Sequence, residues 1–174
     1  MTAHARLRAA TADDHVRTDT AFGAFDLADA GSYAAFLRAH ARALPPIEAL
    51  LTPGEPGWTF RPRTPDLRAD LAALDEAWPA PLSVAIPTEA AGRLGMLYVI
   101  EGSRLGGGML AARVADGLPR AYLSAVHERG AWRAFCQALD AAYTGEAWFA
   151  SLLAGARAAF SLYAAAARVE PAGA

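Results

Sequence analysis

The segment Tyr98-Val-Ile-Glu-Gly-Ser-Arg-Leu-Gly-Gly-Gly-Met-Leu110 places four glycines inside an otherwise apolar, helical pattern. Each glycine in a helix interior costs about 1 kcal/mol relative to alanine, although this chain uses alanine freely elsewhere. Gly95, Gly102 and Gly106 are separated by seven and four residues, so a continuous helix would align them as a smooth strip. A flat ligand lying against that strip is one interpretation, and tight packing against another helix is the alternative.

Other glycine motifs do not fit this segment. No strand precedes it and no Lys-Ser/Thr pair follows it, so it is not a phosphate-binding loop. The pair Gly102-Ser103 lacks the flanking strand and the second glycine of a nucleophile elbow. Di-iron helical bundles need repeated Glu-x-x-His pairs, which are absent from the chain.

A histidine near the N-terminus is the second informative feature. Leu7, Thr11, His15, Thr18 and Phe22 recur at spacings of three and four, which predicts one face of a first helix with His15 pointing inward. Imidazole is the usual axial ligand of haem iron in proteins that bind oxygen on the open side. A hydrogen-bonded histidine in the core is the alternative.

Two charged residues accompany His15 on this helix. Arg8 lies two turns earlier, roughly 10 Å along the axis, and suits the carboxylate edge of a large ligand. Asp19, one turn later, could orient the imidazole. Of the other histidines, His40 falls on an apolar face, whereas we expect His4 at a frayed terminus and His127 in a connection.

The remaining chain is also helical in period. The second helix, from Ser32, contains Pro45 and Pro46, which should kink or break it. Residues 52–65 are rich in proline and glycine and form an irregular connection, onto which Trp58 and Phe60 pack. Alternating strand patterns are absent, so we predict one all-α domain over residues 1–174. The further helices are expected at Asp66–Trp78, Pro87–Val114 (interrupted by its glycines), Trp132–Tyr143 and Trp148–Arg168.

Composition excludes several classes of function. With 16 basic and 18 acidic residues the formal net charge is -2, which provides no electrostatic footprint for nucleic acid or an anionic membrane. Cys136 is the only cysteine, so neither a disulfide nor a cysteine-based zinc site can form within the chain. We find no signal peptide and no stretch near the roughly 20 apolar residues of a membrane span. These features predict a cytoplasmic protein.

Both glycine and histidine segments resemble a known family. The stretch Leu7-Arg-Ala-Ala-Thr11-Ala-Asp-Asp-His15-Val-Arg-Thr-Asp19 resembles the opening motif of haem oxygenases. The stretch from Tyr98 to Gly107 resembles the distal-helix signature of the bacterial, bacteriophytochrome-associated branch. The order and separation of the motifs also match, and the resemblance covers most of the chain. It implies a haem-oxygenase-like helical fold with haem between the first (proximal) helix and a kinked, glycine-rich distal helix.

The resemblance also implies roles for individual residues. His15 matches the axial ligand of the haem iron. Gly102, Ser103 and Gly106 match the catalytic distal segment, where mammalian-type members carry an aspartate at the position of Ser103. The resemblance does not account for Arg104. The residues implied in haem binding are Arg8, Thr11, His15, Val16, Tyr98, Gly102, Gly106 and Arg133.

The implied reaction is oxidative cleavage of haem to biliverdin, with release of CO and ferrous iron. Haem is both cofactor and substrate, O2 is consumed, and electrons come from an external donor, a reductase or a ferredoxin. A bacteriophytochrome receiving biliverdin is a candidate partner. Two alternatives stay open, namely a haem-oxygenase-like protein that binds haem for sensing, storage or transfer without degrading it, and a helical bundle without any cofactor.

Overall fold

The computed structural model describes residues 1–51, 58, 60–84, 87 and 89–170. The described part contains helices and no strand, which confirms the predicted all-α class. The helices are α1 (Ala3–Ala10), α2 (Ala12–Phe22), α3 (Ala30–Glu48), α4 (Thr64–Ala73), α5 (Ala90–Ala111), α6 (Ala121–Ser124), α7 (Ala131–Ala141) and α8 (Glu146–Val169).

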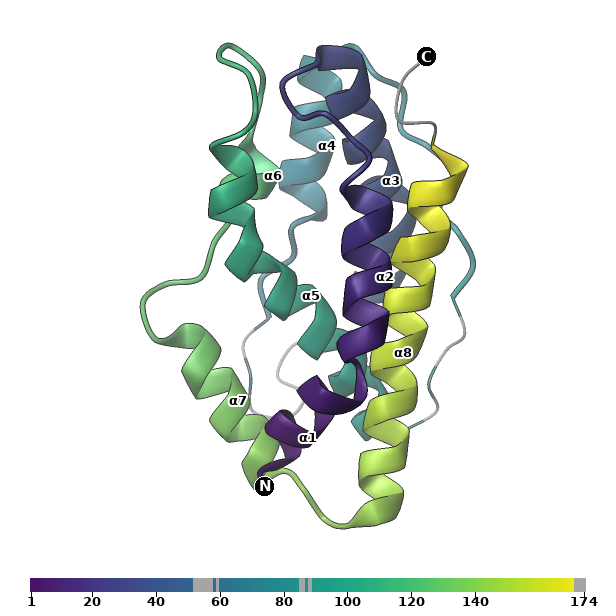
Figure 1. Cartoon of the computed structure of the whole chain (residues 1–174), viewed down its shortest axis with the longest axis vertical. Helices are drawn as coiled ribbons and strands as arrows, with labels where there is room; N and C mark the ends of the chain where they lie inside the picture. Colours follow the sequence, from purple (N-terminus) through teal and green to yellow (C-terminus); the bar gives the residue numbers. More distant parts are fainter. Residues whose placement is uncertain (52–57, 59, 85–86, 88, 171–174) are drawn as a thin grey trace.

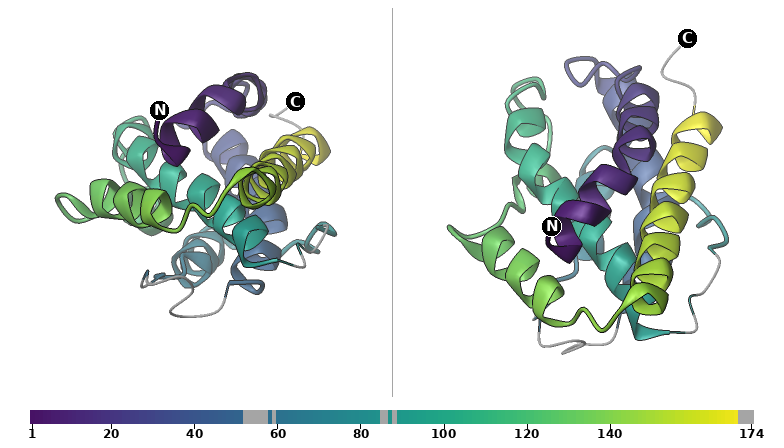
Figure 2. Two further views of the ribbon diagram at one scale, coloured as in Figure 1. Left: turned by 90° about the horizontal axis from the view of Figure 1, so that it is seen from below. Right: turned by 60° about the horizontal axis from the view of Figure 1, so that its bottom comes forward.

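Helices α5 and α8 cross at the centre of the fold (Figure 1). Helices α2 and α3 pack along α8, and α4 and α6 lie on the far side of α3 and α5. Figure 2 shows the short α1 between α7 and α8 at one end of the molecule. The first two helices, α1 and α2, therefore both rest on α8, the last helix of the chain.

The α5–α8 crossing depends on glycine. A Cβ atom on Gly95 would lie 1.9 Å from the carbonyl oxygen of Leu152, and one on Gly155 would lie 1.8 Å from that of Gly92. Only residues without a side chain allow two backbones to approach so closely. Gly95 therefore packs against a helix, and its predicted place in a ligand-facing strip is wrong. The prediction that glycines interrupt this helix is also wrong, because α5 is continuous over 90–111.

The expected first helix is divided in two at Thr11. The backbone of Thr11 has φ -112° and ψ 10°, outside the helical region, and its hydroxyl donates to the carbonyl oxygen of Leu7 at 2.8 Å. Leu7 and Thr11 are buried as predicted. The axis changes direction there, so His15 does not continue the buried stripe, and the prediction that it points into the core is wrong.

Helix α3 passes through its two prolines without a break, contrary to expectation. It begins two residues before Ser32, where the side chain of Asp29 accepts the backbone N–H of Ser32 at 2.8 Å. Pro46 has no N–H for the carbonyl oxygen of Arg42, one turn earlier. The N–H of Leu82 bonds to that oxygen instead, at 2.9 Å, so a connecting segment satisfies the group that the proline leaves unpaired.

Other boundaries shift by a few residues. Helix α4 ends at Ala73, earlier than predicted, and the short α6 was not predicted. Trp58 and Phe60 pack on the core as expected. Of the expected irregular connection, residues 52–57 and 59 lie outside the described residues, as does Thr88 at the expected start of α5.

The prediction that no stretch is long and apolar enough to span a membrane is wrong for helix α8. Its 24 residues are long and apolar enough to cross a membrane by length and composition. However, 56% of its most apolar window is buried inside the fold, where it packs on α5, α3 and α2. This burial is typical of a core helix.

His40 is a hydrogen-bonded histidine packed among aromatic rings of the core. Its ring lies 4.4 Å from that of Phe22 and 4.3 Å from that of Phe36 between centroids, and Nδ1 bonds to the carbonyl oxygen of Phe36 at 2.9 Å. Burial lowers the pKa of His40 to about 3. An unfolded histidine has a pKa of about 6.5. Between these values the unfolded chain binds one more proton than the folded chain, so acid favours unfolding.

We therefore expect the free energy of unfolding to fall by about 1.4 kcal/mol per pH unit on acidification from about pH 6 to pH 4 because of His40. Urea titrations of wild type and His40→Gln across this range measure the contribution. The variant should lose that part of the slope, whereas the exposed His15→Gln should retain it. Equal slopes in wild type and His40→Gln would contradict the assignment.

Candidate active site

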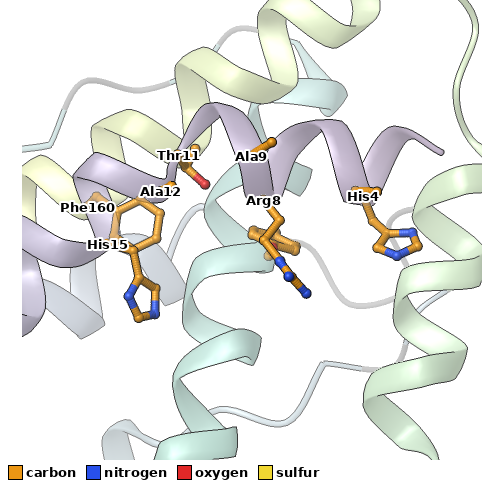
Figure 3. A pocket seen from close by; sticks show the side chains of 9 residues that line it. His4, Arg8, Ala9, Thr11, Ala12, His15 and Phe160 are labelled. Carbon is orange, nitrogen blue, oxygen red and sulfur yellow. The ribbon is translucent and has the colours of Figure 1, made fainter. Parts of the chain in front are cut away.

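A cavity of about 690 Å³ lies between the α1–α2 segment and helix α5 (Figure 3). Small-molecule and cofactor sites usually have volumes of roughly 300–1,000 Å³. Most of its wall comes from the N-terminal helices, with one residue each from α5 and α8. The lining residues are His4, Ala5, Arg8, Ala9, Thr11, Ala12, His15, Tyr98 and Phe160.

The polar lining residues His4, Arg8, Thr11 and His15 follow one another at spacings of four, three and four. This is the spacing of one helix face, and it persists across the bend at Thr11. In Figure 3 the side chains of His4, Arg8 and His15 point to the same side of the ribbon. The bend thus leaves a row of polar groups facing the cavity.

The imidazole of His15 is held from one side. Its Nδ1 lies 3.0 Å from Oδ2 of Asp19, one turn along α2, and its ring meets the edge of Phe160 at a centroid distance of 5.9 Å. A neutral imidazole that donates from Nδ1 to a carboxylate carries its free lone pair on Nε2. The side chain is 62% exposed, so Nε2 is open to a ligand in the cavity.

Arg8 is the lining cation available to an anionic ligand. Among the described residues its guanidinium forms no hydrogen bond or ion pair, and the side chain is exposed. By contrast, Nδ1 of His4 is 2.7 Å from Asp140, and Arg6 is paired with Glu146 at 2.8 Å. Burial raises the pKa of the neighbouring Tyr98, so its phenol stays neutral and can donate a hydrogen bond.

The glycines of α5 separate into two groups. A Cβ on Gly107 would lie 2.6 Å from the carbonyl oxygen of Leu123, so this glycine serves packing against α6, as Gly95 serves packing against α8. A Cβ on Gly106 would meet nothing within 4 Å, and one on Gly102 would lie 3.4 Å from Cη2 of Trp132. Gly102 and Gly106 therefore leave a bare surface on α5 that no backbone covers.

Ser103 lies beside this bare surface and outside the cavity lining. Its hydroxyl donates to the carbonyl oxygen of Ile100 at 2.7 Å and accepts from the guanidinium of Arg63 at 2.6 Å. The same guanidinium nitrogen also reaches the Ile100 oxygen, at 2.7 Å, and Arg63 is buried. Arg63 was not foreseen, because nothing in the irregular connection marks it as a partner of Ser103.

Arg104, which the family resemblance did not account for, is part of a buried polar cluster. Its Nε donates to Oε1 of Glu101 at 2.9 Å, and its Nη1 donates to the carbonyl oxygen of Ala125 at 2.9 Å. Nε2 of His127 is hydrogen-bonded to the carbonyl oxygen of Glu101 at 2.8 Å. This cluster ties the segment after α6 to the middle of α5, and it explains the arginine as structural.

Of the predicted site residues, Arg8, Thr11, His15 and Tyr98 line the cavity together. The exposed Val16 and Arg133 do not line it, and neither do the residues predicted on the distal segment, Gly102, Ser103 and Gly106. Five lining residues were missed, namely Ala5, Ala9 and Ala12 together with His4 and Phe160. His4 is not frayed but helical, and its spacing of four from Arg8 was the signal that could have revealed it. Phe160 carried no such signal, because α8 brings it from far along the chain.

The sequence was compared with known protein families and proteins. No protein-family model matches the chain. A haem oxygenase of Xanthomonas campestris pv. campestris (strain 8004) is 40% identical over 147 residues, which cover 76% of this chain and 87% of that protein. The chain belongs to the haem oxygenase family.

The fold agrees with this family. A crystal structure of the haem oxygenase of Neisseria meningitidis, determined with NO and CO bound, superposes with a TM-score of 0.77. The match covers 98% of this chain and 92% of that chain at 24% sequence identity. The all-helical haem oxygenase fold is therefore shared.

Proposed function

We propose that this protein is a haem oxygenase that opens haem oxidatively to biliverdin, releasing CO and ferrous iron and consuming O2 and electrons from an external donor. Membership of the family supports an enzyme of this kind. The observation that carries the proposal is the imidazole of His15, held by Asp19 at 3.0 Å beside a cavity whose opposite wall is α5.

The cavity residues suit haem as the substrate. Nε2 of His15 is the nitrogen free to bind the iron, and Asp19 keeps the ring in the required tautomer. Arg8 supplies an unpaired cation for a propionate carboxylate, and the phenol of Tyr98 lies on the same wall. Ala9, Ala12 and Phe160 provide apolar surface for the porphyrin. Bound haem contributes the iron at which O2 is activated.

Helix α5 is proposed to let haem approach its backbone closely and to order water beside it. Gly102 and Gly106 present bare backbone, so a flat ring can approach α5 more closely than any side chain would permit. Ser103, fixed by Arg63, places a hydroxyl group at the margin of this surface. We assign Ser103 the role of ordering water there, and Arg63 the role of holding Ser103.

We further propose that residues 1–174 form one cytoplasmic haem-oxygenase-like domain. The chain carries no nucleotide-binding fingerprint, so electrons must come from a separate reductase or ferredoxin. A bacteriophytochrome remains the candidate acceptor of biliverdin. Haem contacts are proposed for the cavity residues and for Gly102 and Gly106, which lie outside the cavity lining on the face of α5 that no backbone covers. Val16 and Arg133 also lie outside the lining, and their haem contacts rest on the family resemblance alone.

The test is a hemin titration of the purified protein, followed by excess ascorbate in air, monitored across the visible spectrum. We expect saturable binding, then loss of the Soret band with growth of the red biliverdin band. Saturable binding with a persistent Soret band would replace the proposal with non-degrading haem binding. No spectral change with hemin would leave a helical bundle without a cofactor.

Gly102→Leu should reduce turnover by about a hundredfold, because a displacement of about 1 Å at the reacting centre has an effect of that size. The new side chain would occupy the bare face of α5 and press on Trp132. The variant should remain helical by circular dichroism. Gly108→Leu is the matched control, because Gly108 is exposed and faces Val126 on another side of α5. Wild-type turnover in Gly102→Leu would show that this face does not meet haem.

A further inference from the structure

Trp132 is the side chain that lies closest to the bare face of α5. Cη2 of its indole is 3.4 Å from the position that a Cβ would take on Gly102, and Cζ3 is 3.8 Å away. Its ring also lies 5.4 Å from that of Tyr98, which lines the cavity. The indole therefore covers α5 at Gly102 and packs near Tyr98 on the cavity wall, whereas the surface at Gly106 is open.

Packing within α7 and the anchored segment before it fix the position of this indole. Trp132 occupies the first turn of α7 and packs on Phe135 at a centroid distance of 5.6 Å. The preceding segment is anchored by His127, whose Nε2 bonds to the carbonyl oxygen of Glu101, the residue before Gly102. Gly130, with φ of 86°, turns the chain from this anchor into α7. The helix that carries the glycines thus also positions the indole.

We propose that Trp132 is a positioning residue of the haem site and forms its side wall at Gly102. This inference rests on the proposed function. A flat ring against Gly102 and Gly106 meets the indole at the Gly102 end, whereas the space beside Gly106 is open. Trp132 thereby limits how far the ring can slide along α5 toward α7, and it determines which edge of the porphyrin faces the helix.

Fluorine NMR of the full chain labelled with 5-fluorotryptophan tests this contact directly. The four tryptophans give four resonances, and Trp132→Phe identifies the one from Trp132. On titration with diamagnetic zinc protoporphyrin IX, the porphyrin ring current should shift the Trp132 resonance more than any other. Trp148, which faces Tyr143 at 6.0 Å, is the internal reference. A Trp132 shift no larger than that of Trp148 would overturn the inference.

Substitution provides the second arm. Trp132→Ala should weaken hemin binding about tenfold, because a large aromatic contact is lost, and it should change the isomer composition of the biliverdin produced. Trp132→Phe should retain both properties, and Trp148→Ala controls for general loss of a large ring. Binding within about twofold of wild type in Trp132→Ala, with unchanged isomers, would refute the role.

The two proposals fail differently. If wild type degrades hemin but the Trp132 resonance and variants show no effect, only the side wall is wrong. If wild type binds neither hemin nor zinc protoporphyrin IX saturably, the proposed function and this inference fall together.

Discussion

Replacement of His15 by alanine should abolish the axial bond to haem iron and with it most turnover. Both lining imidazoles are held by a carboxylate at Nδ1, but the side chain of His15 is 62% exposed and that of His4 is 35% exposed, so Nε2 of His15 is the more open to a ligand. Loss of an outer-shell partner of a metal ligand usually costs 10- to 100-fold in affinity or activity, and loss of the ligand itself should cost more than about a hundredfold. The ferric spectrum of the hemin complex and its ascorbate-driven turnover measure the effect.

Two companion variants sharpen this result. Asp19→Asn keeps the ligand but weakens its orientation, so its turnover should fall by about tenfold, between wild type and His15→Ala. His4→Ala removes the other lining imidazole and should leave the ferric spectrum unchanged. Added imidazole should partly restore the spectrum of His15→Ala. An unaltered ferric spectrum in His15→Ala would exclude it as the iron ligand.

Gly95→Ala should destabilise the whole fold. The new methyl group would lie 1.9 Å from the carbonyl oxygen of Leu152 and 2.7 Å from the backbone nitrogen of Ala156, and neither backbone atom can move aside alone. Helices α5 and α8 would have to separate along their crossing. Overpacking of a core costs about 1–3 kcal/mol, and more where backbone must shift, so we expect a loss of at least about 3 kcal/mol.

Urea unfolding monitored by circular dichroism measures this loss. Gly108→Ala is the matched control in the same helix, because its methyl group would make only an ordinary contact, 3.7 Å from Val126. That variant should gain up to about 1 kcal/mol from helix propensity. If Gly95→Ala proved as stable as Gly108→Ala, the crossing would not depend on a bare backbone.

The contrast between these glycines marks the limit of what the sequence alone could predict. The period of the apolar residues correctly placed most helices, and spacing alone grouped Gly95 with Gly102 and Gly106. Which glycine meets a helix and which meets open space depends on where α8 crosses α5, and α8 lies about fifty residues further along the chain. The packing interpretation is therefore correct at Gly95 and Gly107, whereas contact of a flat ligand with Gly102 and Gly106 stays a prediction.

In the site, too, residues of one helix were predictable from local spacing, whereas residues from distant parts of the chain were not. Arg8, Thr11 and His15 share a helix face, so local spacing was enough to bring them together. The orientation of His15 depended on the bend at Thr11, whose hydroxyl bonds to the carbonyl oxygen of Leu7, and periodicity cannot reveal such a bend. Phe160, Arg63 and Trp132 reach the site through tertiary packing, which a pattern of single helices does not contain.

Backbone contact at the α5–α8 crossing also constrains how the cavity can widen. The crossing cannot slide, so α5 is the rigid wall of the cavity. The opposite wall, α1, is joined to α7 by the hydrogen bond between His4 and Asp140 and to α8 by the surface ion pair Arg6–Glu146. Such an ion pair is weakened by salt. An opened, flexible tetrapyrrole would then leave by displacing α1, so ionic strength would govern departure of the product, while the cleavage step at α5 would be insensitive to it.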